Sequence, residues 1–169
     1  MDPRYPIGRF HRPESIAMAD RVRYISEIAA LPEQLKTAVA PLDDDQLDTP
    51  YRPGGWTVRQ VVHHLADSHM NSYIRFKLAL TEDEPLIKPY AEDQWAEIEE
   101  ARRSPVGVSL TLLTALHMRW VQTLAGMKEA DFQRAFRHPE LGAVRLDMAL
   151  ALYAWHGKHH LGHIAQVAA

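Results

Sequence analysis

Cysteine is absent from this sequence of 169 residues. A chain without thiols forms no disulfide bonds, has no thiolate nucleophile and cannot bind a metal ion through sulfur. Any metal site in this protein must therefore be built from histidine, aspartate or glutamate side chains.

Long apolar runs and an excess of positive charge are also missing. No apolar run approaches the roughly 18–20 residues that a membrane-spanning helix needs. The polar, proline-rich start "MDPRYPIGRFHRPES" lacks the apolar segment of a signal peptide. The 19 basic and 22 acidic residues give a formal net charge of −3, which offers no basic footprint for nucleic acid. We therefore expect a cytoplasmic protein that binds a small-molecule substrate, with neither nucleic acid nor a membrane as partner.

The spacing of apolar residues predicts an all-α fold. Four long helices are expected, at residues 16–40, 57–81, 107–127 and 146–168. The chain length suits one compact core, so we expect residues 1–169 to form a single domain, an antiparallel helix bundle with an irregular N-terminal arm at 1–15.

Local signals refine this pattern. Thr57 and Gln60 have the spacing of a capping box, and Pro32 is expected to break or kink the first helix because it lacks an N–H. Shorter helical segments are expected at 91–103 and 129–136, and a loop or a short extended turn at 137–145.

Histidine is what the sequence has in abundance, with ten residues in all. Four of them fall in the stretch "WHGKHHLGHI", residues 155–164, where their spacing is not that of a purification tag. Residues four apart on a helix project from the same face, so the pairs His156/His160 and His159/His163 could each supply two metal ligands. A third ligand would have to come from a facing helix; otherwise the cluster is a polar helix face.

The candidates for that third ligand are His63, His64 and His69 on the predicted helix 57–81. Apolar periodicity puts His69 near the middle of the buried stripe, His64 at its edge and His63 further round. Periodicity therefore predicts His69 as the most buried imidazole, and a buried histidine is more often a hydrogen-bonded core residue than a ligand. His117 and His138 have no identifiable partners, and we interpret both as structural or surface residues.

Two motifs together carry a family resemblance. The stretches "GGWTVRQVVHHLADSHMNSYIRFKLAL" and "LYAWHGKHHLGHI" resemble the DinB-like superfamily, and "YPIGRF" and "QLDTPYRPGGWT" are similar to its YfiT branch. The resemblance covers nearly the whole chain. It implies a four-helix bundle in up-down-down-up order, and it implies a homodimer.

The resemblance also implies a metal site of three histidines. One is the histidine directly before Leu-Ala-Asp, which is His64, and the other two are the pair His159 and His163. It thus selects His64 where periodicity favours His69. It also prefers His159/His163 to the alternative pair on the same helix.

Three neutral imidazoles on a divalent ion leave a coordination position open, as in catalytic sites. The resemblance therefore implies a metal-dependent hydrolase whose nucleophile is a metal-bound water. Zinc is the expected ion and nickel the alternative, since imidazole suits both. Asp67 is a candidate to orient a neighbouring imidazole, or it is a solvated charge or a partner of Arg75.

Two other functions remain open. The same site could transfer a low-molecular-weight thiol co-substrate, of the bacillithiol type, to an electrophilic small molecule. A cationic pocket would favour that reaction, and Arg75 and Arg119 are candidates, although a surface role is expected for each. The second alternative is a non-catalytic metal-binding stress-response protein. Aromatic side chains that could line a pocket, or belong to the core instead, are Tyr73, Trp120, Tyr153 and Trp155.

Overall fold

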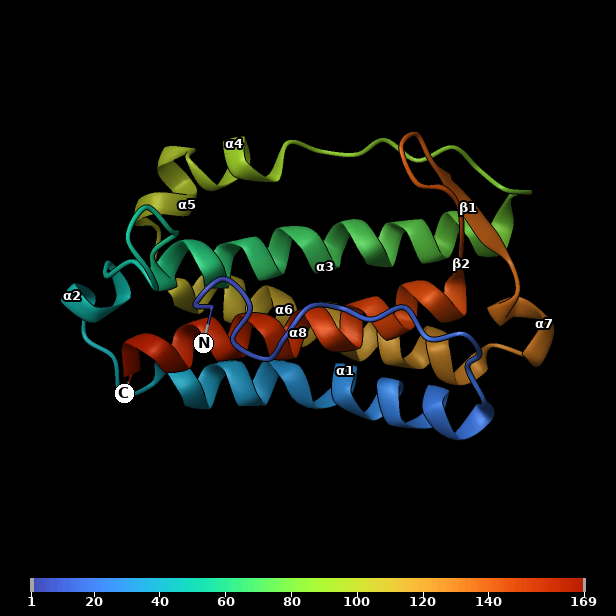
Figure 1. Ribbon diagram of the computed structural model, residues 1–169, viewed down its shortest axis with the longest axis horizontal. Coiled ribbons are helices and arrows are strands. Elements are labelled where there is room, and N and C mark those ends of the chain that lie inside the picture. The colour runs from blue at the N-terminus through green and yellow to red at the C-terminus, as the bar shows by residue number, and fades with distance from the viewer. Residues whose placement is uncertain (1, 169) are drawn as a thin grey trace.

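The computed structural model describes residues 2–168, which form four long helices with short helices and one hairpin between them (Figure 1). In chain order the elements are α1 (Met18–Val39), α2 (Asp44–Leu47), α3 (Val58–Thr81), α4 (Glu92–Ala96), α5 (Glu99–Arg103), α6 (Val106–Gly126), α7 (Glu129–Phe132), β1 (Ala135–His138), β2 (Gly142–Arg145) and α8 (Leu146–Ala168). Among these residues no helix is both long enough and apolar enough to cross a bilayer.

The long helices run in the order up-down-down-up. Helices α1 and α8 point one way and α3 and α6 the other (Figure 1). The members of each parallel pair pack against each other, and across the pairs α1 packs against α6 and α3 against α8. Residues 82–105, with α4 and α5, return along α3, so that α6 begins at the same end of the bundle as α3. This topology confirms the expected all-α bundle.

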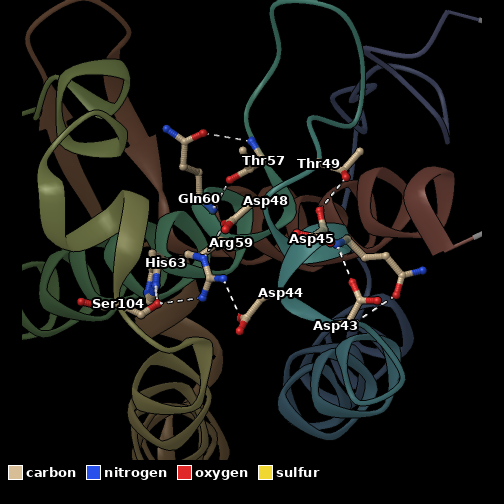
Figure 2. A network of polar contacts seen from close by, with 11 residues as sticks. Asp43, Asp44, Asp45, Asp48, Thr49, Thr57, Arg59, Gln60, His63 and Ser104 are labelled. Atoms are coloured by element: carbon tan, nitrogen blue, oxygen red, sulfur yellow. Dashed lines mark hydrogen bonds and ion pairs between the residues drawn. The ribbon is translucent and has the colours of Figure 1, made fainter.

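The predicted capping box starts α3. The Thr57 side chain accepts the backbone N–H of Gln60, and the Gln60 side chain accepts the backbone N–H of Thr57 at 2.9 Å. Figure 2 shows the buried Arg59 side chain next to this cap, donating to Asp48 at 2.6 Å and to Asp44 at 2.9 Å. The cap and the arginine together fix the end of α3 from which the histidines of this helix project.

Helix α1 runs through Pro32 without a break, so of the two outcomes expected there, a break or a kink, the break does not occur. Proline has no N–H, so the carbonyl of Ile28, four residues earlier, loses its helical donor. The Nδ1 atom of His117 on α6 lies 2.6 Å from that carbonyl oxygen and takes the place of the missing N–H. A side chain from a neighbouring helix therefore keeps the backbone satisfied where the proline interrupts it.

The clearest departure from the sequence prediction is the hairpin β1–β2, where a loop or a short extended turn was expected and no strand pairing was predicted. Its strands pair antiparallel from Ala135 opposite Arg145 to His138 opposite Gly142. Gly142 has φ +72°, a conformation that glycine adopts without strain. The strands have four residues each and too little alternation to be recognised by period. The predicted helices at 91–103 and 129–136 are also shorter: the first is split into α4 and α5, and the second ends at Phe132.

The core is divided along the bundle axis. One apolar cluster surrounds Trp120, Phe76 and Leu150, towards the hairpin, and the other surrounds Leu65 and Leu113. His69 on α3 and His156 on α8 lie between the residues of these two clusters, and His117 on α6 contacts His69 from a position next to Leu116 of the first cluster. A layer of imidazoles therefore crosses the interior of the bundle. It leads to the end of the bundle at which α3 begins.

Candidate metal centre

A cavity of about 540 Å³ opens where α3 begins and α8 approaches its end. It takes side chains from the N-terminal arm, the segment before α3, α4 and both helices. Its lining consists of Arg4, Tyr5, Tyr51, Arg52, Gly54, Gly55, Trp56, His64, Glu92, Asp93, Trp155, His156, His159, His160 and His163. A neighbouring cavity of about 600 Å³ around Arg59 has no histidine in its wall. The histidine ligands for a metal ion are therefore found in the cavity of about 540 Å³.

Five histidines of this cavity form two overlapping groups. Ring nitrogens of His64, His156 and His160 all lie within 4.8 Å of one another, and so do ring nitrogens of His159, His160 and His163. His160 belongs to both groups. The predicted ligands His64, His159 and His163 thus line one cavity, with one residue in the first group and two in the second.

Burial keeps these imidazoles neutral near pH 7. It lowers the pKa of His64 and of His159 to about 4, with the neighbouring histidines adding to the effect. Burial also lowers the pKa values of His156, His160 and His163. A neutral imidazole keeps a lone pair for a cation, so no proton has to be displaced from these residues before a metal binds.

One buried nitrogen of the cluster has no partner. Nδ1 of His159 is shielded from solvent and forms no hydrogen bond among the described residues. A buried polar atom of this kind costs free energy unless it is paired. Together with the neutral donors around it, the unpaired atom fits a site for a divalent cation.

Aromatic rings hold the outer histidines in place. Tyr51 stacks on His163 with ring centroids 4.0 Å apart, and Trp155 stacks on His159 at 4.4 Å. Nε2 of His163 lies 3.1 Å from the carbonyl oxygen of Arg4 in the N-terminal arm. Such contacts limit ring rotation and leave fewer orientations to be lost when a ligand binds.

The sequence profile of the DinB superfamily matches residues 27–164. The chain belongs to the DinB superfamily. A Bacillus mycoides (strain KBAB4) protein is 54% identical over 166 residues, and a Bacillus cereus (strain B4264) protein is 55% identical over 168. Each match covers 98% of this chain and 95% of the relative, and both relatives bear the name "putative metal-dependent hydrolase".

Solved structures agree with this assignment. YfiT from Bacillus subtilis, described as "a probable metal-dependent hydrolase with an unusual four-helix bundle topology", superposes with a TM-score of 0.96 at 48% identity. That match covers 99% of this DinB protein and 97% of YfiT. The four-helix bundle protein TT2238 superposes with a TM-score of 0.57 at 20% identity, over 83% of this chain and 94% of its own, and supports the fold alone.

Two other histidines of this DinB protein lie apart from the cavity. Nε2 of His63 donates to the carbonyl of Ser104 at 3.0 Å (Figure 2). Its Nδ1 accepts the Ser109 hydroxyl at 2.7 Å, so the ring ties α3 to the start of α6. His138 stabilises the hairpin turn, where its Nδ1 accepts the backbone N–H of Glu140 at 3.1 Å. Both are structural: the sequence analysis interpreted His138 in this way, whereas it kept His63 as a candidate for the third ligand.

His69 and His117 share the interior of the bundle. His69 is completely buried, as periodicity predicted, and its Nδ1 lies 2.9 Å from Nε2 of His117. His117 is structural, one of the two roles expected for it, and its partners, which the sequence did not identify, are His69 and the Ile28 carbonyl. The sequence signal for that contact was Pro32, which frees a carbonyl on the facing helix.

The other candidates divide between cavity and core. Of the four aromatic candidates only Trp155 lines the cavity; Tyr73 and Trp120 belong to the apolar core, and the Tyr153 hydroxyl lies 3.2 Å from that of Ser68. The Asp67 carboxylate takes no part in the hydrogen bonds and ion pairs found within residues 2–168, either with a histidine or with Arg75.

Proposed function

We propose that this DinB protein is an enzyme that hydrolyses a small molecule with the help of a divalent metal bound by His64, His159 and His163. The observation that carries the proposal is the gathering of neutral, buried imidazoles on the wall of an open cavity. The names of the relatives, which cover nearly the whole chain, support the same activity. A divalent ion held there supplies Lewis-acid activation of a water molecule or of a substrate carbonyl.

Two aromatic side chains orient the proposed metal ligands. Tyr51 and Trp155 hold the rings of His163 and His159, so that two of the three ligands are oriented in advance. Zinc is the ion we expect, with nickel as the alternative, because neutral imidazole suits both. We place the enzyme in the cytoplasm as a homodimer, which rests on the composition and on the family.

Thiol transfer is the second candidate for the same site. Arg4 and Arg52 lie on the cavity wall, where they offer positive charge to a carboxylate of a thiol co-substrate. Arg75 and Arg119, which the sequence suggested for this role, are not among the lining residues. Transfer requires added thiol and consumes an electrophile, whereas hydrolysis proceeds without thiol, so one pair of assays separates the two reactions. A protein that binds metal but performs neither reaction would fit the non-catalytic alternative.

The test is the metal content of protein purified without a nickel column. We expect about one ion per chain in the parent protein and almost none in a His64→Ala/His159→Ala variant, because the latter keeps only one of the three ligands. His63→Ala is the matched control, since His63 neighbours His64 but lies in the α3–α6 contact. A parent protein that is free of metal and takes up no added zinc would contradict the proposal.

A further inference from the structure

A tight turn holds Arg52 on the wall of the histidine cavity. The carbonyl of Arg52 accepts the backbone N–H of Gly55 at 2.9 Å, and Gly54 between them has φ +69°. Since proline precedes this left-handed glycine, the four residues form a type II turn. The N–H of Tyr51 donates to the carbonyl of Trp56 at 3.1 Å and closes the segment behind the turn. The backbone that carries Arg52 is therefore fixed relative to the start of α3.

The side chain of Arg52 lies against the same turn and close to the histidines. A Cβ atom built on Gly55 would lie 2.8 Å from Cγ of Arg52, so the side chain crosses a position where only glycine leaves room for it. The guanidinium carbon lies 5.5 Å from the centre of the Tyr51 ring, and the same ring stacks on His163 at 4.0 Å. The guanidinium and a proposed metal ligand thus contact one shared aromatic ring.

No carboxylate neutralises the charge of Arg52 within residues 2–168. Its Nη1 donates to the carbonyl of Pro53 at 3.0 Å, whereas Nε is buried without a partner and the side chain forms no ion pair. Arg4, the other arginine of the cavity wall, is held by Asp2 through contacts of 3.1, 3.2 and 2.9 Å. A guanidinium has five donors, so Arg52 is the arginine of this wall that keeps both charge and donors for a ligand.

Other residues of the cavity decide which anion fits. Glu92 and Asp93 of α4 line the same cavity and form no ion pair among the described residues. Both repel additional negative charge, which disfavours a phosphate dianion. A carboxylate carries a single charge and accepts two parallel N–H bonds from a guanidinium. Tyr51 and Trp56 lie on the wall as well, where their rings favour an apolar or aromatic part of the ligand.

We propose that Arg52 is a carboxylate subsite, so that the small molecule on which this DinB protein acts carries one carboxylate group beside an apolar or aromatic part. Arg52 binds the carboxylate and thereby determines which compounds enter the cavity. The inference rests on the proposed function in that the rest of the compound must reach the metal ligands. The subsite itself requires no metal.

The first test uses metal-free protein, because a carboxylate would otherwise bind the metal ion directly. Phenylacetate, phenylacetamide and benzylphosphonate share a benzyl group, and tryptophan fluorescence reports their binding, since Trp56 and Trp155 line the cavity. We expect phenylacetate to bind most tightly of the three. Arg52→Gln should weaken phenylacetate about tenfold, as expected for the loss of a charge-assisted hydrogen bond, and leave phenylacetamide unchanged. Arg52→Lys should fall between, because it keeps the charge without the planar pair of donors.

Two further variants separate the subsite from a general effect of charge. Arg9→Gln removes a cation that lies 4.1 Å from the centre of the Tyr5 ring but does not line the cavity, and it should bind phenylacetate like the parent. Arg4→Gln should lose less affinity than Arg52→Gln, because Asp2 already pairs with Arg4. Equal binding of phenylacetate and phenylacetamide by the parent, or unchanged binding of phenylacetate by Arg52→Gln, would overturn the proposal. Tightest binding of benzylphosphonate would overturn the choice of a carboxylate.

The second test uses zinc-loaded protein to identify the source of the carboxylate. N-acetylphenylalanine represents a compound to be hydrolysed, and its analogue with a thiol in place of the acetamido group represents a thiol co-substrate. The compound that loses more affinity in Arg52→Gln identifies the source, and unchanged affinity for both would overturn the proposal. A protein that binds phenylacetate through Arg52 but takes up no zinc would contradict the proposed metal-dependent function and leave the carboxylate subsite intact.

Discussion

The raised pKa of Asp67 predicts an effect on stability that can be measured without a metal ion. The carboxylate is half-buried, and burial, followed by the nearby charge of Glu100, raises its pKa to about 6. Between the ordinary value of 3.8 and pH 6 the folded chain therefore holds a proton that the unfolded chain has lost. Stability contributed by this group falls as pH rises through that window, and above pH 6 the folded state carries the cost of a charged, half-buried carboxylate.

Asp67→Asn should remove that cost. We expect the variant to melt at a higher temperature than the parent at pH 7.5, and the difference to disappear near pH 4, where the parent carboxyl is protonated. Thermal melts at both pH values measure this. Glu99→Gln removes an exposed carboxylate of α5 and should show a smaller change with pH, and equal gains for both variants would argue against burial as the cause.

Gly162 shows how a single position joins two elements. A Cβ atom built on Gly162 of α8 would lie 2.8 Å from Cγ of Pro6, so the N-terminal arm passes this helix at a distance that only glycine permits. The same arm supplies the Arg4 carbonyl that accepts from His163. A side chain at position 162 must therefore push the arm away from the metal centre.

Gly162→Ala should release the arm. We expect faster trypsin cleavage after Arg9 and weaker zinc binding, despite the gain in helix propensity that alanine brings. Gly107→Ala on α6 is the matched control, because a Cβ atom there would meet no atom within 4 Å. If both variants are cleaved at the parent rate, the contact with Pro6 does not hold the arm.

Helices α1 and α6 are coupled through one carbonyl. His117→Leu should leave the Ile28 carbonyl buried without a donor, at a cost of about 1–3 kcal/mol in the free energy of unfolding. Pro32→Ala restores a backbone N–H within reach of that carbonyl. The cost of His117→Leu should therefore be smaller in the Pro32→Ala background, and urea denaturation of the four proteins of this double-mutant cycle measures the difference. Equal costs in both backgrounds would mean that the proline does not create the need for His117.

The elements predicted from the sequence are those that local signals define. The capping box at Thr57 and the apolar periodicity of the long helices place their ends within about two residues. The hairpin was not predicted because its four-residue strands alternate too little to be recognised. The continuity of α1 through Pro32 was not predicted because it depends on His117, a residue far from Ile28 in the chain. Periodicity correctly predicted that His69 is buried. It could not predict that His117 donates to the Ile28 carbonyl, because that contact joins two different helices.

The whole bundle has buried imidazoles in the middle of its core, among them His69 and His117. Their burial affects the stability of the protein at acid pH. The pKa of His117 is lowered from 6.5 to about 4 by burial, so between these values the unfolded chain binds a proton that the folded chain does not. The contribution of this group to stability is complete above pH 6.5 and is lost progressively as pH falls towards 4. Burial lowers the pKa of His69 in the same direction, and its loss adds to that of His117.

We therefore expect the free energy of unfolding of the metal-free protein to fall steeply between pH 6.5 and 5, by more than the limit of about 1.4 kcal/mol per pH unit for one titrating group. Urea titrations at pH 7.5, 6.5, 5.5 and 5 measure this slope. His138→Ala should keep the slope of the parent, because His138 lies in the hairpin turn, whereas His69→Gln should reduce it. A slope that stays flat below pH 6.5 would show that the imidazole layer admits protons without unfolding. The buried imidazoles would then be accessible to water in the folded protein.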